Sequence, residues 1–459
     1  MTLPGVEKRL QDRYEKLVAE HAGHAHPVAS GPRVLPGESS THAAAMSAWR
    51  FYQNPRTCFT RLARPLLDAA KDSAATRCSD FALVPMDWSK LDYKAHPSKT
   101  DRAQIGNEHE LGYKLLTALL VSDKDGQPLA PLCVQLETAE GLLSSRLERV
   151  RPVGSPVDDL APVMNFVCGL GLGLPPVFII DAQADSVDHF RRWDRRGRLF
   201  LVRGDGERLA RLGDKDGEEL THAAIAGRLR EQGAFRLVRC VEYEGKEVGQ
   251  YVAEQAVVLD RPACWDRKVD GRRVLRRIKG KALPLRLVIT ELRGEGGEVL
   301  ERWYLLTNVP AAQVDAATVA LWYYWRWKIE SFFKLLKNSG QQVEHWQQEN
   351  GRSVLKRLLI AAMASVLAWR LAHSEAPQAE EARRTVMRLS GRQVEHGKAY
   401  TLEGLLAGLW VLLAMADVLE ETPAGKVRDL ARFVLSGSSS GEPPNTPTPR
   451  SQLTCHLRD

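Results

Sequence analysis

The 459-residue chain has little of what marks several classes of protein. Its 7 cysteines are scattered singly, which excludes a disulfide-stapled mini-domain and argues against a thiolate zinc site. The N-terminal residues contain no apolar core of a signal peptide. The nearest approach to a membrane-length apolar run, residues 402–418, is interrupted by Glu403, Gly404 and Gly408, and we interpret it as a buried helix. We therefore expect a cytoplasmic protein with no membrane partner.

The charge balance is close to even. Lys and Arg total 64 against 57 Asp and Glu, a formal net charge of +7. Hydrophobic residues make up 44% of the chain, which excludes a largely disordered protein. The mild excess of base permits an anionic partner without identifying one.

Apolar runs and turn signals predict a mixed α/β protein. The predicted strands of the core are residues 81–86, 115–121, 129–136, 177–180 and 199–202. The first three read as an antiparallel meander with an Asp-Gly turn at 125–126, and residues 139–150 read as a helix. Strands separated by helices suggest one mixed sheet with flanking helices.

The same patterns divide the chain. The predicted parts are a helical N-terminal DNA-binding region (1–80), a first core part (81–205), a β-rich insertion module (206–312), a second core part (313–375), a helical C-terminal region (376–435) and a disordered tail (436–459).

Residues 323–337 carry the most informative pattern. At about 100° per residue, one narrow helical face collects Tyr323, Arg326, Glu330, Lys334 and Lys337. An Arg and a Glu four residues apart can simply stabilise a solvated helix. That interpretation does not explain an aromatic and three cations around one acid, whereas guanidinium and ammonium groups bind phosphate oxygens.

Two aspartates follow buried strands: Asp87 after 81–86 and Asp181 after 177–180. With Glu330 they form a set of carboxylates of the kind that Mg²⁺ prefers. Two such ions can promote cleavage of a phosphodiester.

The spacing Tyr-x2-Arg-x3-Glu-x6-Lys resembles the Y-R-E-K signature of bacterial DDE transposases of the insertion-sequence-4 type. The resemblance spans roughly residues 43–372 and implies an RNase-H-like core in which Asp87, Asp181 and Glu330 are catalytic and hold metal. It also implies that Arg203 faces DNA and that Trp303 stacks on a flipped base. Without the resemblance, Trp303 would be read as a core residue of a strand.

The family's activity is cut-and-paste DNA transposition. The resemblance therefore implies two Mg²⁺ ions (Mn²⁺ can substitute), a hairpin intermediate, transposon ends and target DNA as double-stranded substrates, and a homodimer on DNA. Tyr323, Arg326, Lys334 and Lys337 would contact the DNA. One departure is Ala182, where the family usually has Arg. Two alternatives stay open: an RNase-H-like nuclease without strand transfer, and a non-catalytic DNA-binding derivative.

Other charged residues invite weaker interpretations. Basic stretches at 191–203 and 267–281 are plausible DNA backbone contacts next to a phosphate-handling site. Asp185 is expected to cap the helix after Asp181. Asp92, Asp101 and Glu108 are expected to be loop acids.

Overall fold

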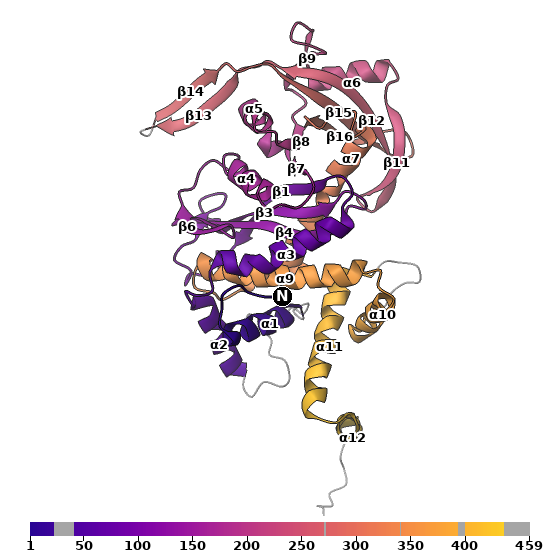
Figure 1. Ribbon diagram of the computed structural model, residues 1–459. Helices are drawn as coiled ribbons and strands as arrows, with labels where there is room; N and C mark the ends of the chain where they lie inside the picture. Colours follow the sequence, from indigo (N-terminus) through magenta and orange to yellow (C-terminus); the bar gives the residue numbers. More distant parts are fainter. Residues whose placement is uncertain (23–40, 270–271, 340, 393–399, 436–459) are drawn as a thin grey trace, which may run out of the picture.

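The computed structural model describes residues 1–22, 41–269, 272–339, 341–392 and 400–435 (Figure 1). The predicted tail, 436–459, lies outside these residues.

One large mixed sheet of 14 strands runs through the described part of the chain. Its main path is β10-β9-β12-β15-β16-β8-β7-β1-β3-β4-β5-β6, with β11 beside β12 and β2 beside β3. The strands of the first half are β1 (Ala82–Asp92), β2 (Ala103–Gln104), β3 (Leu111–Ser122), β4 (Pro128–Thr138), β5 (Gly141–Ser144), β6 (Leu147–Arg151), β7 (Pro176–Ile180) and β8 (Leu199–Gly204). The prediction of a mixed α/β fold is confirmed.

The centre of the sheet is the order β4-β3-β1-β7-β8. β1, β3 and β4 pair antiparallel, and β7 then joins β1 in parallel and β8 in parallel. β7 reads Pro-Val-Phe-Ile-Ile and is buried after its first residue, as expected of a strand covered on both faces. This arrangement matches the RNase-H-like sheet that the sequence predicts.

The second half of the sheet extends the same layer. Its strands are β9 (Leu209–Leu212), β10 (Glu219–Thr221), β11 (Arg236–Tyr243), β12 (Lys246–Leu259), β15 (Leu283–Arg293) and β16 (Val299–Thr307). β16 pairs with β8, so the predicted β-rich module shares its sheet with the core. A separate hairpin, β13 (Ala263–Val269) and β14 (Arg272–Ile278), extends away from the body in Figure 1.

Helices cover both faces of the core. α4 (Leu160–Cys168) and α5 (Val187–Arg195) lie on one side in Figure 1, and α3 (Phe59–Arg77) and α9 (Gly351–His373) lie on the other. Most of α9 is buried, including its polar Ser353 and Ser365. A helix apolar on nearly all sides must sit inside the protein, and α9 does so between β4, α3 and α1 (Lys8–Ala22).

The predicted helix at 139–150 is wrong, because this segment forms β5 and β6. Thr138 pairs with Gly141 in a tight hairpin, and Gly141 has a φ of +132°. Leu142 and Leu143 point to opposite faces of a strand, and both are buried. The run of two leucines therefore reflects a strand covered on both faces.

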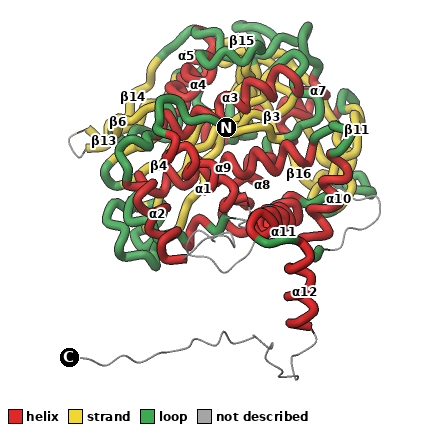
Figure 2. Tube along the Cα trace, turned by 60° about the horizontal axis from the view of Figure 1, so that its bottom comes forward, coloured by secondary structure: helices red, strands yellow, loops and turns green. Residues whose placement is uncertain are grey.

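The terminal helices pack around α9. α2 (Thr41–Gln53) and α10 (Ala379–Leu389) both contact it, and α11 (Leu402–Glu421) packs on α10. α12 (Ala424–Leu435) projects from the body in Figure 2.

α11 departs from the prediction of a buried helix. Leu405 and Leu406 are buried, but Leu412, Met415 and Leu419 are 38 to 46% exposed. Within the described residues, α11 is the one helix long and apolar enough to cross a membrane, by length and composition alone.

Candidate active site

Asp87 and Asp181 lie side by side because their strands are parallel. The pairing of β1 with β7 ends at Met86 opposite Ile180, so the next residue on each strand is an aspartate. Asp87 lies inside β1 rather than at its end, since β1 continues to Asp92 along β3. Adjacent strands are about 4.8 Å apart, which brings the two carboxylates to one edge of the parallel pairing.

Glu330 comes from the helical segment, but this segment is not one regular helix. α7 (Ala316–Trp325) ends before Arg326, α8 (Trp327–Lys334) begins after it, and a π-helical turn, η2 (Leu335–Ser339), follows. The junction is a tighter turn, with the amide of Arg326 donating to Tyr323 and that of Ile329 donating to Arg326. The five residues that the sequence predicts on one helical face therefore do not share a single regular helix.

Arg326 joins two of the three predicted catalytic acids. Its Nη1 lies 2.6 Å from Oδ2 of Asp87, and its Nη2 lies 2.8 Å from Oε1 of Glu330. The side chains of Arg326 and Asp87 are only 8% and 12% exposed, whereas that of Glu330 is 38% exposed. One guanidinium thus bridges a strand carboxylate and a helix carboxylate.

The electrostatics leave this site short of positive charge. Burial, together with the charges of Asp181 and Glu330, raises the pKa of Asp87 to about 6 in spite of the opposing charge of Arg326. Asp181 accepts a hydrogen bond from the amide of Gln183 at 3.0 Å, which is the local turn that starts η1 (Ala182–Ala184). Three carboxylates therefore act on each other around one guanidinium.

The donor chemistry fits a hard cation. All three side chains are carboxylates, which are the ligands that Mg²⁺ takes from proteins. Among the described residues, however, no three His, Cys, Asp or Glu side chains are grouped closely enough to hold an ion together. Arg326 occupies the place between Asp87 and Glu330 and bonds to both.

Three of the predicted DNA contacts form a second cluster. Trp303 and Tyr323 are 2% and 1% exposed, and their rings meet edge to face at 5.2 Å. Glu301 accepts hydrogen bonds from the indole of Trp303 and from Arg203, both at 3.1 Å. Burial raises the pKa of Tyr323, so its phenol stays protonated. In this arrangement Trp303 has no exposed ring face for a base.

Sequence reasoning missed Glu301, which organises this cluster. It lies two residues before Trp303 on β16, so the two side chains share one face of the sheet. This alternation was the only available signal.

The two lysines lie apart from the acids. Lys337, in the π-helical turn, pairs with Glu344 at 3.6 Å. Glu344 in turn accepts the amide of Asp92 at 2.9 Å, near the end of β1. Lys334 ends α8 and is exposed. The structure therefore brings Arg326 and Glu330 together and places Lys337 beside a different carboxylate.

Two weaker expectations are corrected. Asp185 does not cap α5, because the N-cap of this helix is Ser186. The side chain of Asp185 is 3% exposed and pairs with Arg208 at 3.3 Å and with Arg261 at 3.1 Å. Arg191, from the basic stretch, is 7% exposed and donates to backbone carbonyls, including that of Lys281 at 2.7 Å. Both residues join the core to the inserted strands.

One loop acid is also structural. Asp101 is 5% exposed, accepts the hydroxyl of Tyr113 and accepts the amide of Gly351 at 2.8 Å, at the start of α9. Glu108 is exposed, as expected of a loop acid.

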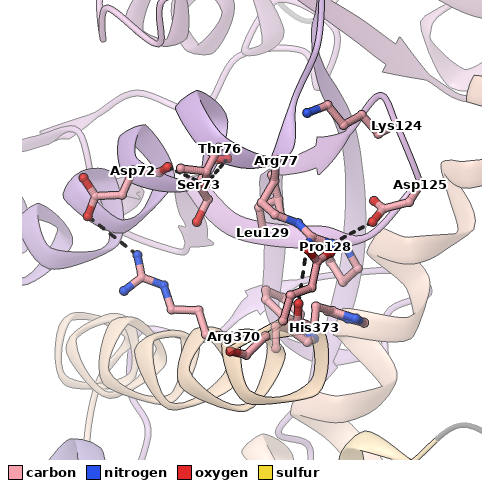
Figure 3. Close-up of a pocket in the computed structure, with 13 residues that line it drawn as sticks. Asp72, Ser73, Thr76, Arg77, Lys124, Asp125, Pro128, Leu129, Arg370 and His373 are labelled. Atoms are coloured by element: carbon pink, nitrogen blue, oxygen red, sulfur yellow. Dashed lines mark hydrogen bonds and ion pairs between the residues drawn. The ribbon is translucent and has the colours of Figure 1, made fainter. Parts of the chain in front are cut away.

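A cavity of about 720 Å³ lies elsewhere, between α3, the β3–β4 turn and the end of α9 (Figure 3). Its charges are compensated internally: Arg77 lies 2.7 Å from Asp125, and Arg370 lies 3.8 Å from Asp72. It contains none of the predicted site residues.

Part of the chain is similar to a known protein family. Residues 172–367 match the transposase DDE domain family. The matched segment includes Asp181, Trp303 and Glu330 and begins after Asp87. The family match therefore says nothing of Asp87, and it is the pairing of β1 with β7 that places Asp87 beside Asp181.

The chain was also compared with curated proteins and with solved structures. No curated protein matches it. Among solved structures it is similar to the cryo-EM structure of a piggyBac transposase synaptic complex with hairpin DNA, at 11% identity and a TM-score of 0.33. The match covers 84% of this chain and 63% of that one, so the chain spans less than two thirds of the other protein's length.

Proposed function

We propose that the protein is a DDE transposase of the insertion-sequence-4 type that cleaves DNA at the ends of a mobile element and joins them to target DNA. The observation that carries this proposal is that Arg326 bonds to both Asp87 and Glu330, while the parallel pairing of β1 with β7 sets Asp181 on the strand next to Asp87. The match to the transposase DDE domain over residues 172–367 supports it independently of that geometry.

Asp87, Asp181 and Glu330 would hold the metal ions, most simply two Mg²⁺ with Mn²⁺ as a substitute. Such ions activate water as a nucleophile and stabilise the leaving oxygen of a phosphodiester. The protein's own part would be to hold two carboxylates at neighbouring strands of the sheet and the third, Glu330, on α8. Asp87 is only 8% exposed, so water has little access to this carboxylate.

The predicted DNA-contacting cations would position the DNA backbone. Arg326, Lys334 and Lys337 supply charge for phosphates, and Arg203 supplies it on the neighbouring strand. If cleavage proceeds through a hairpin, a base is extruded, which costs a few kcal/mol that stacking on an aromatic offsets. Trp303 is the candidate for this stacking, and it would first have to separate from Tyr323 and Glu301.

The partners follow from the reaction. Double-stranded DNA is the substrate, as transposon ends and as target. Two ends must be cut in concert, so we expect a homodimer on DNA, acting in the cytoplasm at the nucleoid.

The test is cleavage of DNA carrying the inverted repeats that flank the gene, in Mg²⁺ or Mn²⁺. Asp181→Asn and Glu330→Gln should each abolish nicking, which we expect to fall at least about 1,000-fold, while DNA binding persists. Asp181 suits this test because the hydrogen bond that it accepts is local, from the amide of Gln183. Asp92→Asn is the matched control, because Asp92 is an exposed acid at the end of β1.

Each result has a defined meaning. Normal nicking by Asp181→Asn or Glu330→Gln refutes the catalytic assignment. Nicking without strand transfer identifies the RNase-H-like nuclease. DNA binding without metal-dependent nicking by the unmodified chain identifies a non-catalytic derivative.

A further inference from the structure

Arg326 stands in the site in a way that the proposed chemistry does not require. It bonds to Asp87 and Glu330 at once, so its guanidinium takes the electrostatic place of a cation between them. Its carbon Cζ also lies 5.7 Å from the ring centre of Tyr323 and 5.5 Å from that of Trp327. The side chain is thus enclosed by two acids and two aromatic faces.

The enclosure is incomplete. The Nε atom of Arg326 is buried and has no hydrogen-bond partner among the described residues. A buried donor without a partner costs free energy, so this arrangement leaves part of the guanidinium unsatisfied. An incoming phosphate oxygen would satisfy it, because a guanidinium binds phosphate through two parallel N–H donors.

We propose that Arg326 is a positioning residue that couples the metal site to DNA. In the free protein it bridges Asp87 and Glu330 and keeps them from binding metal. A DNA phosphate draws the guanidinium away, and the two carboxylates are then available as ligands. The inference rests on the proposed function and adds to it an order of assembly, DNA before metal.

The coupling is reciprocal by thermodynamic linkage. If Arg326 must leave Asp87 before metal binds, then removing Arg326 strengthens metal binding. If Arg326 must leave Asp87 before a phosphate binds, then removing the charge of Asp87 strengthens DNA binding. A role for Arg326 in orienting the carboxylates as ligands predicts the opposite sign for the first change.

The first experiment measures binding of Mn²⁺ alone to the DNA-free full chain by electron paramagnetic resonance. Arg326→Gln should bind Mn²⁺ about 10- to 100-fold more tightly than the unmodified protein, the equivalent of one charged hydrogen bond. Arg286→Gln is the matched control, since Arg286 is a buried arginine held by Glu254 at 2.6 Å, away from the site. It should leave Mn²⁺ binding unchanged. Adding Glu330→Gln to Arg326→Gln should abolish the gain and so locate the ion.

The second experiment uses a 20-base-pair duplex of arbitrary sequence in EDTA, followed by fluorescence anisotropy. Asp87→Asn should raise the affinity several-fold more than Asp92→Asn, which removes the same charge from the same strand. The slope of log affinity against log salt should steepen by about 1, because one more cation reaches a phosphate. Far-UV circular dichroism of every variant establishes that it is folded.

The outcomes distinguish failure of the Arg326 coupling from failure of the proposed metal site. Equal or weaker Mn²⁺ binding by folded Arg326→Gln, with binding intact in the unmodified protein, overturns the coupling alone. Absence of Mn²⁺ binding in both overturns the coupling and the proposed metal site together. Equal effects of Asp87→Asn and Asp92→Asn on DNA affinity also overturn the coupling.

Discussion

Glu291 is a buried acid at the centre of a charge cluster in the inserted half of the sheet. It lies on β15, its side chain is fully buried, and it pairs with three arginines. Arg293 donates to one of its oxygens at 2.7 Å and 3.0 Å, Arg302 donates to the other at 2.8 Å, and Arg230 of α6 (His222–Glu231) also contacts it. Glu291→Gln keeps the shape and removes the charge.

Opposing effects set the loss of stability that we expect for Glu291→Gln. Burial raises the pKa of Glu291, but the hydrogen bond from Arg293 and the charges of Arg302 and Arg230 outweigh it and hold the pKa below its usual value. Removing one partner of a buried ion pair costs about 3–5 kcal/mol. The three arginines are 21 to 46% exposed and regain some hydration, so we expect about 2–3 kcal/mol.

Hydrogen exchange is the suitable assay, because a chain of this size need not unfold in one step. A local loss of 2–3 kcal/mol lowers the protection of peptides from β15 and β16 by roughly 30- to 150-fold. Glu7→Gln is the control, since Glu7 and its partner Arg56 are 67% and 64% exposed. A change of less than about threefold in Glu291→Gln would refute the reasoning and show that water already solvates these arginines.

Two further predictions concern stability. Burial lowers the pKa of His222 to about 4. Between about pH 4 and 6.5 the unfolded chain therefore binds a proton at this ring that the folded chain does not. The free energy of unfolding consequently rises with pH over this range, by up to about 3 kcal/mol. His222→Gln should flatten this rise in urea titrations, whereas His109→Gln, at an exposed ring, should not; an unchanged slope in His222→Gln would assign it to other groups. Gly126 has a φ of +68° and a Cβ there would meet the ring of Trp325 at 2.4 Å, while Gly197 has a φ of +63° in open space. Gly126→Ala should therefore lower stability by about 1–3 kcal/mol more than Gly197→Ala, and equal losses would mean that Trp325 moves aside freely.

The sequence predicted which of these side chains lie close together where their placement follows from local rules. A buried strand followed by an acid occurs at Asp87 and at Asp181, and parallel pairing brings such residues together. An i, i+4 spacing puts Arg326 beside Glu330 on any helix. Asp87 lies before the matched family segment, and its nearness to Asp181 follows from the pairing of β1 with β7.

Other features depend on contacts that no local pattern records. β8 and β16 are separated by about a hundred residues, so the union of core and module in one sheet follows from long-range pairing. No proline or glycine signals the break at Arg326, since residues 322–327 are aromatic apart from that arginine. Trp303 fits a strand core and a base platform equally well by residue type, and only its burial against Tyr323 distinguishes its present state.

The placement of the cations changes how the +7 charge should act on DNA. Arg203 is held by Glu301 at 3.1 Å, Lys337 by Glu344 at 3.6 Å, and Arg326 by two of the predicted catalytic acids. Each of these cations must give up an internal partner before it can replace a counterion on a phosphate. If the protein binds DNA as proposed, internal pairing would lower non-specific binding, because affinity for DNA grows with the number of phosphates neutralised. These cations would then be reserved for DNA that fits the site closely enough to compete. Selectivity between ends and other DNA would then depend on the free energy of exchanging ion pairs, and not on the total charge.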